Sequence, residues 1–200
     1  IQKKINIIEK EKTFFTFEAV KVEKLKTVLQ RKDSLSYRHL KELFNNIAKQ
    51  LEDLEDDGFC NLFFNINDVI RIELNTQNQV GGTGNDILFL YLNTKQFLPI
   101  EQKITKIIKP FDKNNLFISP ELKNIKTFPI DIHINSQLYT LASFVCYCGE
   151  WNKNKTSFKN TEKNMDIYKE YLSNIANTKL YWALLRCLED KPINRIYLYI

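Results

Sequence analysis

The segment from residue 36 to residue 55 carries apolar side chains at the spacing of one face of an α-helix. These side chains are Leu40, Leu43, Phe44, Ile47, Leu51 and Leu54. Their intervals fit a period of about 3.6 residues per turn. Ser36 stands before the run, where it can cap the helix, and Gly58 follows, where it can end it. A helix this long with one apolar face must cover a core, so the chain predicts a packed domain.

Two strand-like segments follow the helix, at residues 68–74 and 86–92, and the sequence predicts that they form a hairpin with a long polar loop. The loop contains Gly81-Gly82-Thr83-Gly84. A strand, not a helix, comes after these glycines, so they predict a flexible turn instead of a phosphate-binding loop. Upstream, residues 4–18 predict a second hairpin and residues 20–31 a short helix.

The rest of the chain combines an irregular segment with three helices. Residues 93–135 contain four prolines and predict irregular structure. The apolar stretch from Leu138 to Cys148 is 11 residues long, and a membrane-spanning helix needs about 20. It therefore predicts a buried helix over 136–148. A polar loop is expected at 152–164. The last two helices are expected at 165–176 and 178–189.

Charge and cysteine usage argue against a nucleic-acid groove and favour a reducing compartment. The 29 Lys and Arg residues are largely offset by 24 Asp and Glu, which leaves a net charge of +5. Both signs are spread along the chain, so we do not expect nucleic-acid binding. The short apolar stretch from Leu138 to Cys148 is the reason that we expect no membrane span. The cysteines form no C-x-x-C pair and predict buried thiols, with no metal site. They are Cys60, Cys146, Cys148 and Cys187.

Heavy use of Asn, Lys and Ile is typical of A+T-rich genomes, such as those of large DNA viruses. We therefore expect an intracellular protein or a component of a virus particle. This expectation rests on composition alone.

Three short motifs stand in a fixed order in the second half of the chain. Phe117-Ile118-Ser119-Pro120-Glu121 comes first. Ser136-Gln137-Leu138-Tyr139-Thr140-Leu141-Ala142 then opens the predicted buried helix, and Pro192-Ile193-Asn194-Arg195 follows the last helix. In this order the motifs resemble the A-P-E segment, the central helix and the late P-x-x-R of a protein-kinase C-lobe.

The resemblance implies an α+β, protein-kinase-like fold, in which a remnant β-hairpin of the N-lobe precedes a mainly α-helical C-lobe. Residues 1–31 would form the N-lobe hairpin and a hinge-like segment at Glu18-Ala19-Val20, and residues 32–200 the helical C-lobe. It also implies a buried bidentate ion pair between Glu121 and Arg195. A hydrogen-bonded contact between them would support the kinase-like interpretation, and a wide separation would exclude it.

The catalytic loop of kinases reads H-R-D-x-x-x-x-N. The residues that correspond to it here lack the side chains that phosphoryl transfer needs. Asn61, Leu62 and Phe63 stand at the His, Arg and Asp positions, and Asp68 stands at the metal-binding Asn. A phenylalanine can neither accept a proton nor orient a hydroxyl group. The resemblance therefore implies that phosphoryl transfer at this loop is lost.

Two further positions depart from the kinase pattern. Asn93 stands at the Asp of D-F-G and lacks the charge needed to hold Mg²⁺ between phosphates. Gln137 replaces the Asp that steadies the catalytic loop from the central helix. The Gly-rich loop and the Lys–Glu pair of an N-lobe would precede Ile1 and are not in this sequence.

Together these residues predict a catalytically inactive kinase-like domain, a pseudokinase, that acts as a protein-binding scaffold or a structural component. It would have no catalytic residue, no cofactor and no bound nucleotide. Two alternatives stay open. One is a divergent ATP-dependent protein phosphotransferase with an N-lobe before Ile1 and unorthodox carboxylates such as Asp68 or Asp86. The other is an α+β interaction or virion structural domain unrelated to kinases.

Overall fold

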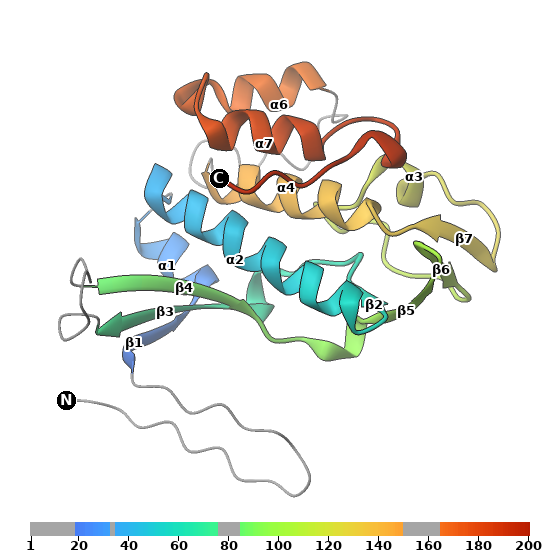
Figure 1. Cartoon of the computed structure of the whole chain (residues 1–200), viewed down its shortest axis with the longest axis horizontal. Helices are drawn as coiled ribbons and strands as arrows, with labels where there is room; N and C mark the ends of the chain where they lie inside the picture. The colour runs from blue at the N-terminus through green and yellow to red at the C-terminus, as the bar shows by residue number, and fades with distance from the viewer. Residues whose placement is uncertain (1–18, 33–34, 76–84, 150–164) are drawn as a thin grey trace, which may run out of the picture.

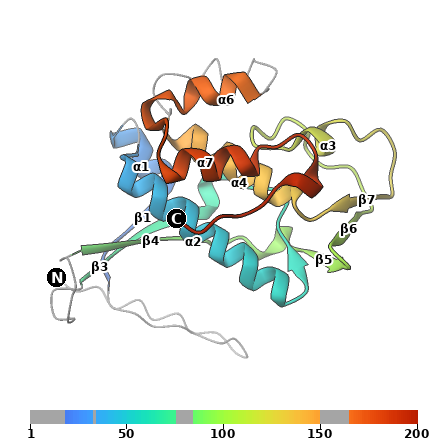
Figure 2. The ribbon, with the colours of Figure 1, turned by 45° about the horizontal axis from the view of Figure 1, so that its top comes forward.

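The chain folds into a mixed α+β structure in which a long helix lies between a small sheet and a group of other helices (Figures 1 and 2). A computed structural model describes residues 19–32, 35–75, 85–149 and 165–200. The hairpin expected at 4–18, the glycines at 81–84 and the loop expected at 152–164 lie outside the described residues. The division into segments 1–31 and 32–200 stays a prediction, since most of the first segment lies outside them as well.

Six α-helices lie within the described residues. They are α1 (Leu25–Lys32), α2 (Tyr37–Asp56), α3 (Pro120–Lys123), α4 (Ser136–Gly149), α6 (Met165–Tyr171) and α7 (Lys179–Cys187). Short 3₁₀ turns, again among the described residues, are η1 (Ile66–Asp68), η2 (Thr94–Gln96), η3 (Ser173–Ile175) and η4 (Pro192–Asn194). The helix expected at 165–176 thus ends at Tyr171 and continues only as η3.

The first long helix begins and ends where the sequence predicts. The Ser36 side chain caps α2 by accepting a hydrogen bond of 3.4 Å from the backbone N–H of His39. Gly58 follows the helix with a φ of 84°, a left-handed conformation that glycine adopts without steric cost.

A three-stranded antiparallel sheet lies on one side of α2. It consists of β1 (Ala19–Lys24), β3 (Val69–Asn75) and β4 (Asn85–Tyr91), in the order β1-β3-β4. The predicted hairpin of β3 and β4 is confirmed to within one residue. The prediction for residues 18–31 is wrong in part, because Ala19 and Val20 belong to β1 and the helix begins only at Leu25. The cause is the pairing of β1 with β3, a contact between distant segments that local pattern does not reveal.

Side-chain amides of α2 cover the outer edge of β4. The Asn46 Oδ1 atom accepts a hydrogen bond of 2.8 Å from the backbone N–H of Phe89. The Gln50 amide bonds the carbonyl of Phe89 and the N–H of Tyr91, both at 3.0 Å. These bonds fix the orientation of α2 along the sheet. Because the loop that carries Phe63 follows α2, its position depends on this orientation.

A second antiparallel sheet occupies the other end of the molecule (Figure 1). It consists of β2 (Phe59–Cys60), β5 (Leu98–Glu101), β6 (Ile104–Ile107) and β7 (Ile130–His133), in the order β2-β5-β6-β7. The prediction of irregular structure over 93–135 is therefore wrong for three of these strands and for α3. The strands are four residues long, too short for a clear alternation, and β6 pairs with a strand far along the chain.

The main core lies where α2 and α4 meet the other helices and the inner face of the first sheet. Nearly every side chain of α4 is buried, so the prediction of a buried helix at 136–148 is confirmed. A smaller core under the second sheet includes Leu62, Leu122 and Ile132. The four cysteines are buried with free thiols. No described helix is long and apolar enough to cross a membrane.

Candidate functional site

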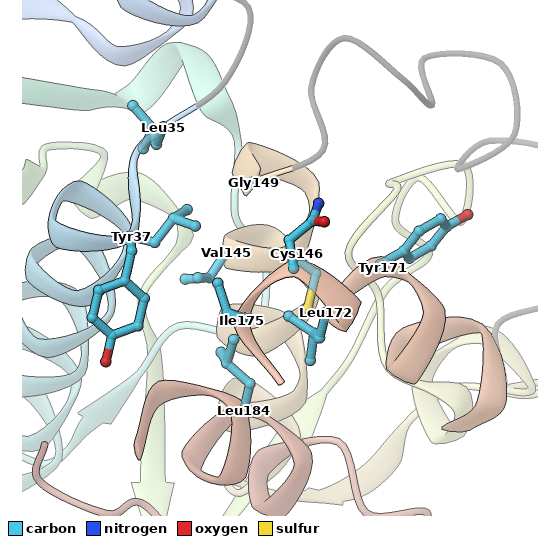
Figure 3. Close-up of a pocket in the computed structure, with 11 residues that line it drawn as sticks. Leu35, Tyr37, Val145, Cys146, Gly149, Tyr171, Leu172, Ile175 and Leu184 are labelled. Atoms are coloured by element: carbon cyan, nitrogen blue, oxygen red, sulfur yellow. The ribbon is translucent and has the colours of Figure 1, made fainter. Parts of the chain in front are cut away.

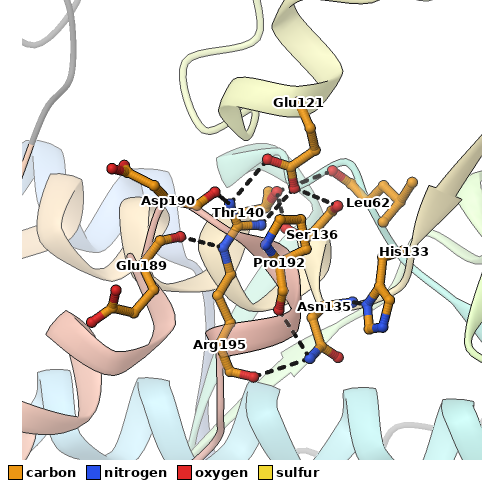
Figure 4. Close-up of polar contacts among 10 residues, drawn as sticks. All are labelled: Leu62, Glu121, His133, Asn135, Ser136, Thr140, Glu189, Asp190, Pro192 and Arg195. Atoms are coloured by element: carbon orange, nitrogen blue, oxygen red, sulfur yellow. Dashed lines mark hydrogen bonds and ion pairs between the residues drawn. The ribbon is translucent and has the colours of Figure 1, made fainter.

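Glu121 and Arg195 form the bidentate ion pair that the kinase resemblance implies (Figure 4). Arg195 Nη1 lies 2.5 Å from Glu121 Oε1, and Arg195 Nη2 lies 3.0 Å from Glu121 Oε2. The Arg195 side chain is fully buried. The pair joins α3, which carries Glu121, to the segment after α7. Two parallel charge-assisted bonds hold these segments in one orientation.

Two further N–H groups of Arg195 donate to backbone carbonyls. Its Nε atom donates to the carbonyl of Glu189 at 2.6 Å, and Nη2 donates to the carbonyl of Asp190 at 2.9 Å. The guanidinium lies 5.0 Å from the centre of the Tyr139 ring, so its flat face contacts an aromatic surface. A buried guanidinium with a carboxylate and two carbonyls around it is a structural group, not one free to bind a ligand.

Glu121 stays ionised because hydrogen bonds to its carboxylate lower its pKa by more than burial raises it. Burial alone would raise the pKa of the Glu121 carboxyl. The bonds from Arg195 and from the Ser136 hydroxyl, which lies 2.5 Å from Oε1, hold the pKa below its ordinary value. Ser136 is the first residue of α4. The carboxylate therefore connects α3, α4 and the chain after α7 at one point.

Asn135 fixes the turn that carries Arg195 (Figure 4). Its Nδ2 atom donates to the carbonyl of Pro192 at 3.2 Å and to that of Arg195 at 3.0 Å. Its own N–H donates to His133 Nδ1 at 3.1 Å. Burial, Lys103 and Arg195 all lower the pKa of His133, which favours the neutral ring that accepts this bond. His133 thus belongs to the support of the ion pair.

The loop after α2 is held in place by two side chains of α4. The Gln137 Oε1 atom accepts a hydrogen bond of 3.2 Å from the buried N–H of Asn61. The Thr140 hydroxyl lies 3.3 Å from the carbonyl of Leu62 (Figure 4). Gln137 departs from the kinase pattern in residue type, yet its side chain still accepts a hydrogen bond from the backbone of this loop. An amide oxygen accepts a backbone hydrogen bond as a carboxylate does, without a buried charge.

Phe63, which the kinase resemblance aligns with the catalytic aspartate, packs into an aromatic group. Its ring lies 4.9 Å from that of Phe111, which in turn lies 6.1 Å from Phe128. The Asn61 side chain bonds the N–H of Phe63 at 3.1 Å and so holds the loop from within. At this position the described chain presents an apolar surface and no acid or base.

Asp68 and Asn93, which the resemblance aligns with the two metal-binding positions of kinases, lie side by side. The Asn93 Nδ2 atom donates to Asp68 Oδ2 at 2.9 Å, and the backbone N–H of Leu92 donates to the carbonyl of Asp68 at 2.9 Å. Asp86 lies near the opposite end of β4 and does not join them. The described residues contain no group of three His, Cys, Asp or Glu side chains able to hold a metal ion. One carboxylate and one amide are too few ligands for a tight Mg²⁺ site.

Ser119, the first residue of the Ser-Pro-Glu motif, is buried without a role for its hydroxyl. It precedes α3, with Pro120 as the first helical residue, but makes no side-chain cap bond. Its Oγ atom has no hydrogen-bond partner among the described residues. A buried hydroxyl without a hydrogen-bond partner carries a desolvation cost.

Comparison with known proteins leaves the family of the chain open. No protein-family model matches the sequence, and no curated protein matches it.

Proposed function

We propose that this chain is a catalytically inactive kinase-like domain that works as a protein-binding scaffold. The observation that carries the proposal is the packing of Phe63 against Phe111 where a kinase needs its catalytic carboxylate. The loop around Phe63 is ordered by Gln137 and Thr140. This loop is held in place by hydrogen bonds, but the residue at its proposed catalytic position is apolar. This combination fits a protein that has kept a kinase-like fold and lost phosphoryl transfer.

The Glu121–Arg195 pair supports the kinase-like part of the proposal. The motif order predicted a contact between two residues that are 74 positions apart, and they are hydrogen-bonded. A wide separation would have excluded the interpretation. The Asn61–Gln137 bond adds a second contact at a position where the resemblance implies a support for the loop. Neither contact identifies a binding partner. The proposed scaffold role is argued from the apolar side chain of Phe63, which offers neither an acid nor a base for phosphoryl transfer.

The absence of nucleotide binding is tested by a thermal-shift titration of the chain with ATP, with and without Mg²⁺ or Mn²⁺. A ligand that binds only the folded state stabilises it by mass action. We expect no shift at millimolar nucleotide. A metal-dependent shift of several degrees would contradict an inactive, nucleotide-free domain.

The scaffold role is tested separately by cross-linking mass spectrometry in an extract of the protein's own source. We expect a protein that cross-links saturably to the folded chain and is displaced by an excess of unlabelled chain. A heat-unfolded sample is the control. Equal capture by folded and unfolded samples, or no displacement, would contradict a specific scaffold. Capture of a particle protein would favour a structural role in a virion.

The contact between Asp68 and Asn93 favours one second candidate, a divergent ATP-dependent phosphotransferase. The two residues keep the adjacency, though not the charge, of a metal-binding pair. An assay for transfer of labelled γ-phosphate, on the natural full-length protein with Mn²⁺, tests it. Transfer that is lost in Asp68→Asn but kept in Asp86→Asn would establish this candidate and overturn the inactive scaffold.

A further inference from the structure

A cavity of about 250 Å³ lies among four helical segments, at the opposite end of α4 from the Glu121–Arg195 pair. Its wall is formed by the start of α2, the end of α4, the segment from α6 to η3, and α7 (Figure 3). The 14 residues of α4 separate the two regions by about 20 Å along the helix. The cavity therefore belongs neither to the ion pair nor to the loop at Phe63.

The wall of the cavity is mainly apolar. Leu40, Leu172 and Leu184 contribute buried aliphatic side chains, and Val145 contributes another. Tyr37 and Tyr171 lie on opposite sides of it (Figure 3). No Asp, Glu, Lys, Arg or His is among the described lining residues. A charged ligand would lose its hydration here without gaining a counter-ion.

We propose that this cavity is a binding site for a small uncharged aromatic molecule, larger than benzene and of the size of a two-ring compound. The volume supports this size, since an apolar cavity of about 150 Å³ binds benzene and drug-sized ligands occupy about 300 Å³ or more. The described wall offers no charged partner to a nucleotide, a phosphate or a carboxylate. The proposal does not depend on the proposed scaffold role.

Indole is a suitable probe because it is uncharged, has two rings and dissolves in water. Methyl-resolved NMR of the chain with indole measures both affinity and position. We expect saturable shifts of the methyl groups of Val145 and Leu184, which line the cavity. Absence of saturation, or shifts confined to other parts of the molecule, would overturn the proposal.

A matched pair of variants tests the location. Ile175 lines the cavity from η3 and is only partly buried, so Ile175→Trp can fill the space from the rim without rebuilding the core. Ile193 is 75% exposed and lies in η4, outside the lining, so Ile193→Trp is its control. We expect Ile175→Trp to weaken indole binding by about tenfold or more, and Ile193→Trp to leave it unchanged. Equal affinity in the two variants would place indole elsewhere.

The charge requirement is tested on the unsubstituted chain, which removes any dependence on the folding of a variant. Indole-3-acetate has the same rings and adds one carboxylate. We expect it to bind about tenfold more weakly than indole, because the described part of the lining supplies no cation. Equal or tighter binding of indole-3-acetate would show that the site is not selective for uncharged molecules.

Discussion

The backbone N–H of Asn61 donates a hydrogen bond of 3.2 Å to the side-chain oxygen of Gln137, and both residues are buried. The bond crosses from the loop after α2 to the first turn of α4. It is a contact through which the central helix fixes the loop that carries Phe63.

Replacing Gln137 with leucine should destabilise the fold by about 1–3 kcal/mol, because the Asn61 N–H would stay buried without an acceptor. Urea unfolding measures the free energy, and hydrogen exchange should show faster exchange of the Asn61 amide. Gln30→Leu on the exposed side of α1 is the control and should change little. An unchanged free energy for Gln137→Leu would show that the bond does not support the loop.

Replacing Arg195 with alanine should cost about 3–5 kcal/mol, because Glu121 would keep a partly buried charge without its partner. Arg186→Ala, on the exposed side of α7, should stay within about 0.5 kcal/mol of the unsubstituted chain. Denaturant unfolding of Arg195→Ala, Glu121→Gln and the double variant gives the coupling energy. Additive effects of the two substitutions would contradict a direct ion pair.

Replacing Ser119 with alanine should leave the stability unchanged or raise it by up to about 1 kcal/mol. The hydroxyl is buried and has no hydrogen-bond partner among the described residues, so its removal ends a desolvation cost. Thermal unfolding measures the effect, with the exposed Ser173→Ala as control. A marked loss of stability would mean that the Ser119 hydroxyl has a partner in solution.

Acid should remove the stabilisation that Glu23 gives to the first sheet. The Arg31 guanidinium, with Lys21 and against the effect of burial, lowers the pKa of Glu23 from 4.5 to about 2. The lowered pKa means that this stabilisation is present above pH 4.5 and is lost as the pH falls towards about 2. Glu121 also has a lowered pKa and contributes in the acid range, so only a comparison of variants isolates Glu23.

Arg31→Gln provides that comparison. It should lose less stability than the unsubstituted chain between pH 4.5 and pH 2, because the pKa of Glu23 would lie nearer its ordinary value. Unfolding free energies measured across this range test it, and Arg38→Gln on the exposed side of α2 should follow the unsubstituted chain. Parallel curves for Arg31→Gln and the unsubstituted chain would contradict the role of Arg31.

Local patterns in the sequence were sufficient to predict the elements whose residues interact mainly with near neighbours in the sequence. The spacing of Leu40 and its successors predicted α2, and the apolar run after Ser136 predicted α4. Strands β5, β6 and β7 were missed because their stability comes from partners such as Ile104 and His133, which are distant in sequence. Four-residue strands carry too few residues for alternation to show.

The same contrast holds for the candidate site. The resemblance to a kinase C-lobe implied the contact of Glu121 with Arg195, and the two residues are hydrogen-bonded. The function of Gln137 was missed because the sequence shows the loss of a carboxylate and not the retention of an acceptor. The cavity near Val145 had no sequence signal, since its wall comes from four separate segments that look like ordinary core.

The hydrogen bonds from Asn46 and Gln50 to β4 have a consequence for assembly. An exposed strand edge is a template on which other chains can add strands and polymerise. Here the N–H and carbonyl of Phe89 and the N–H of Tyr91 are already bonded, so no foreign strand can join along that part of β4. At the other margin of the sheet, β1 carries the charged side chains of Lys21, Glu23 and Lys24, which disfavour strand addition. The bonded edge of β4 and the charged edge of β1 therefore make the first sheet resistant to growth by strand addition.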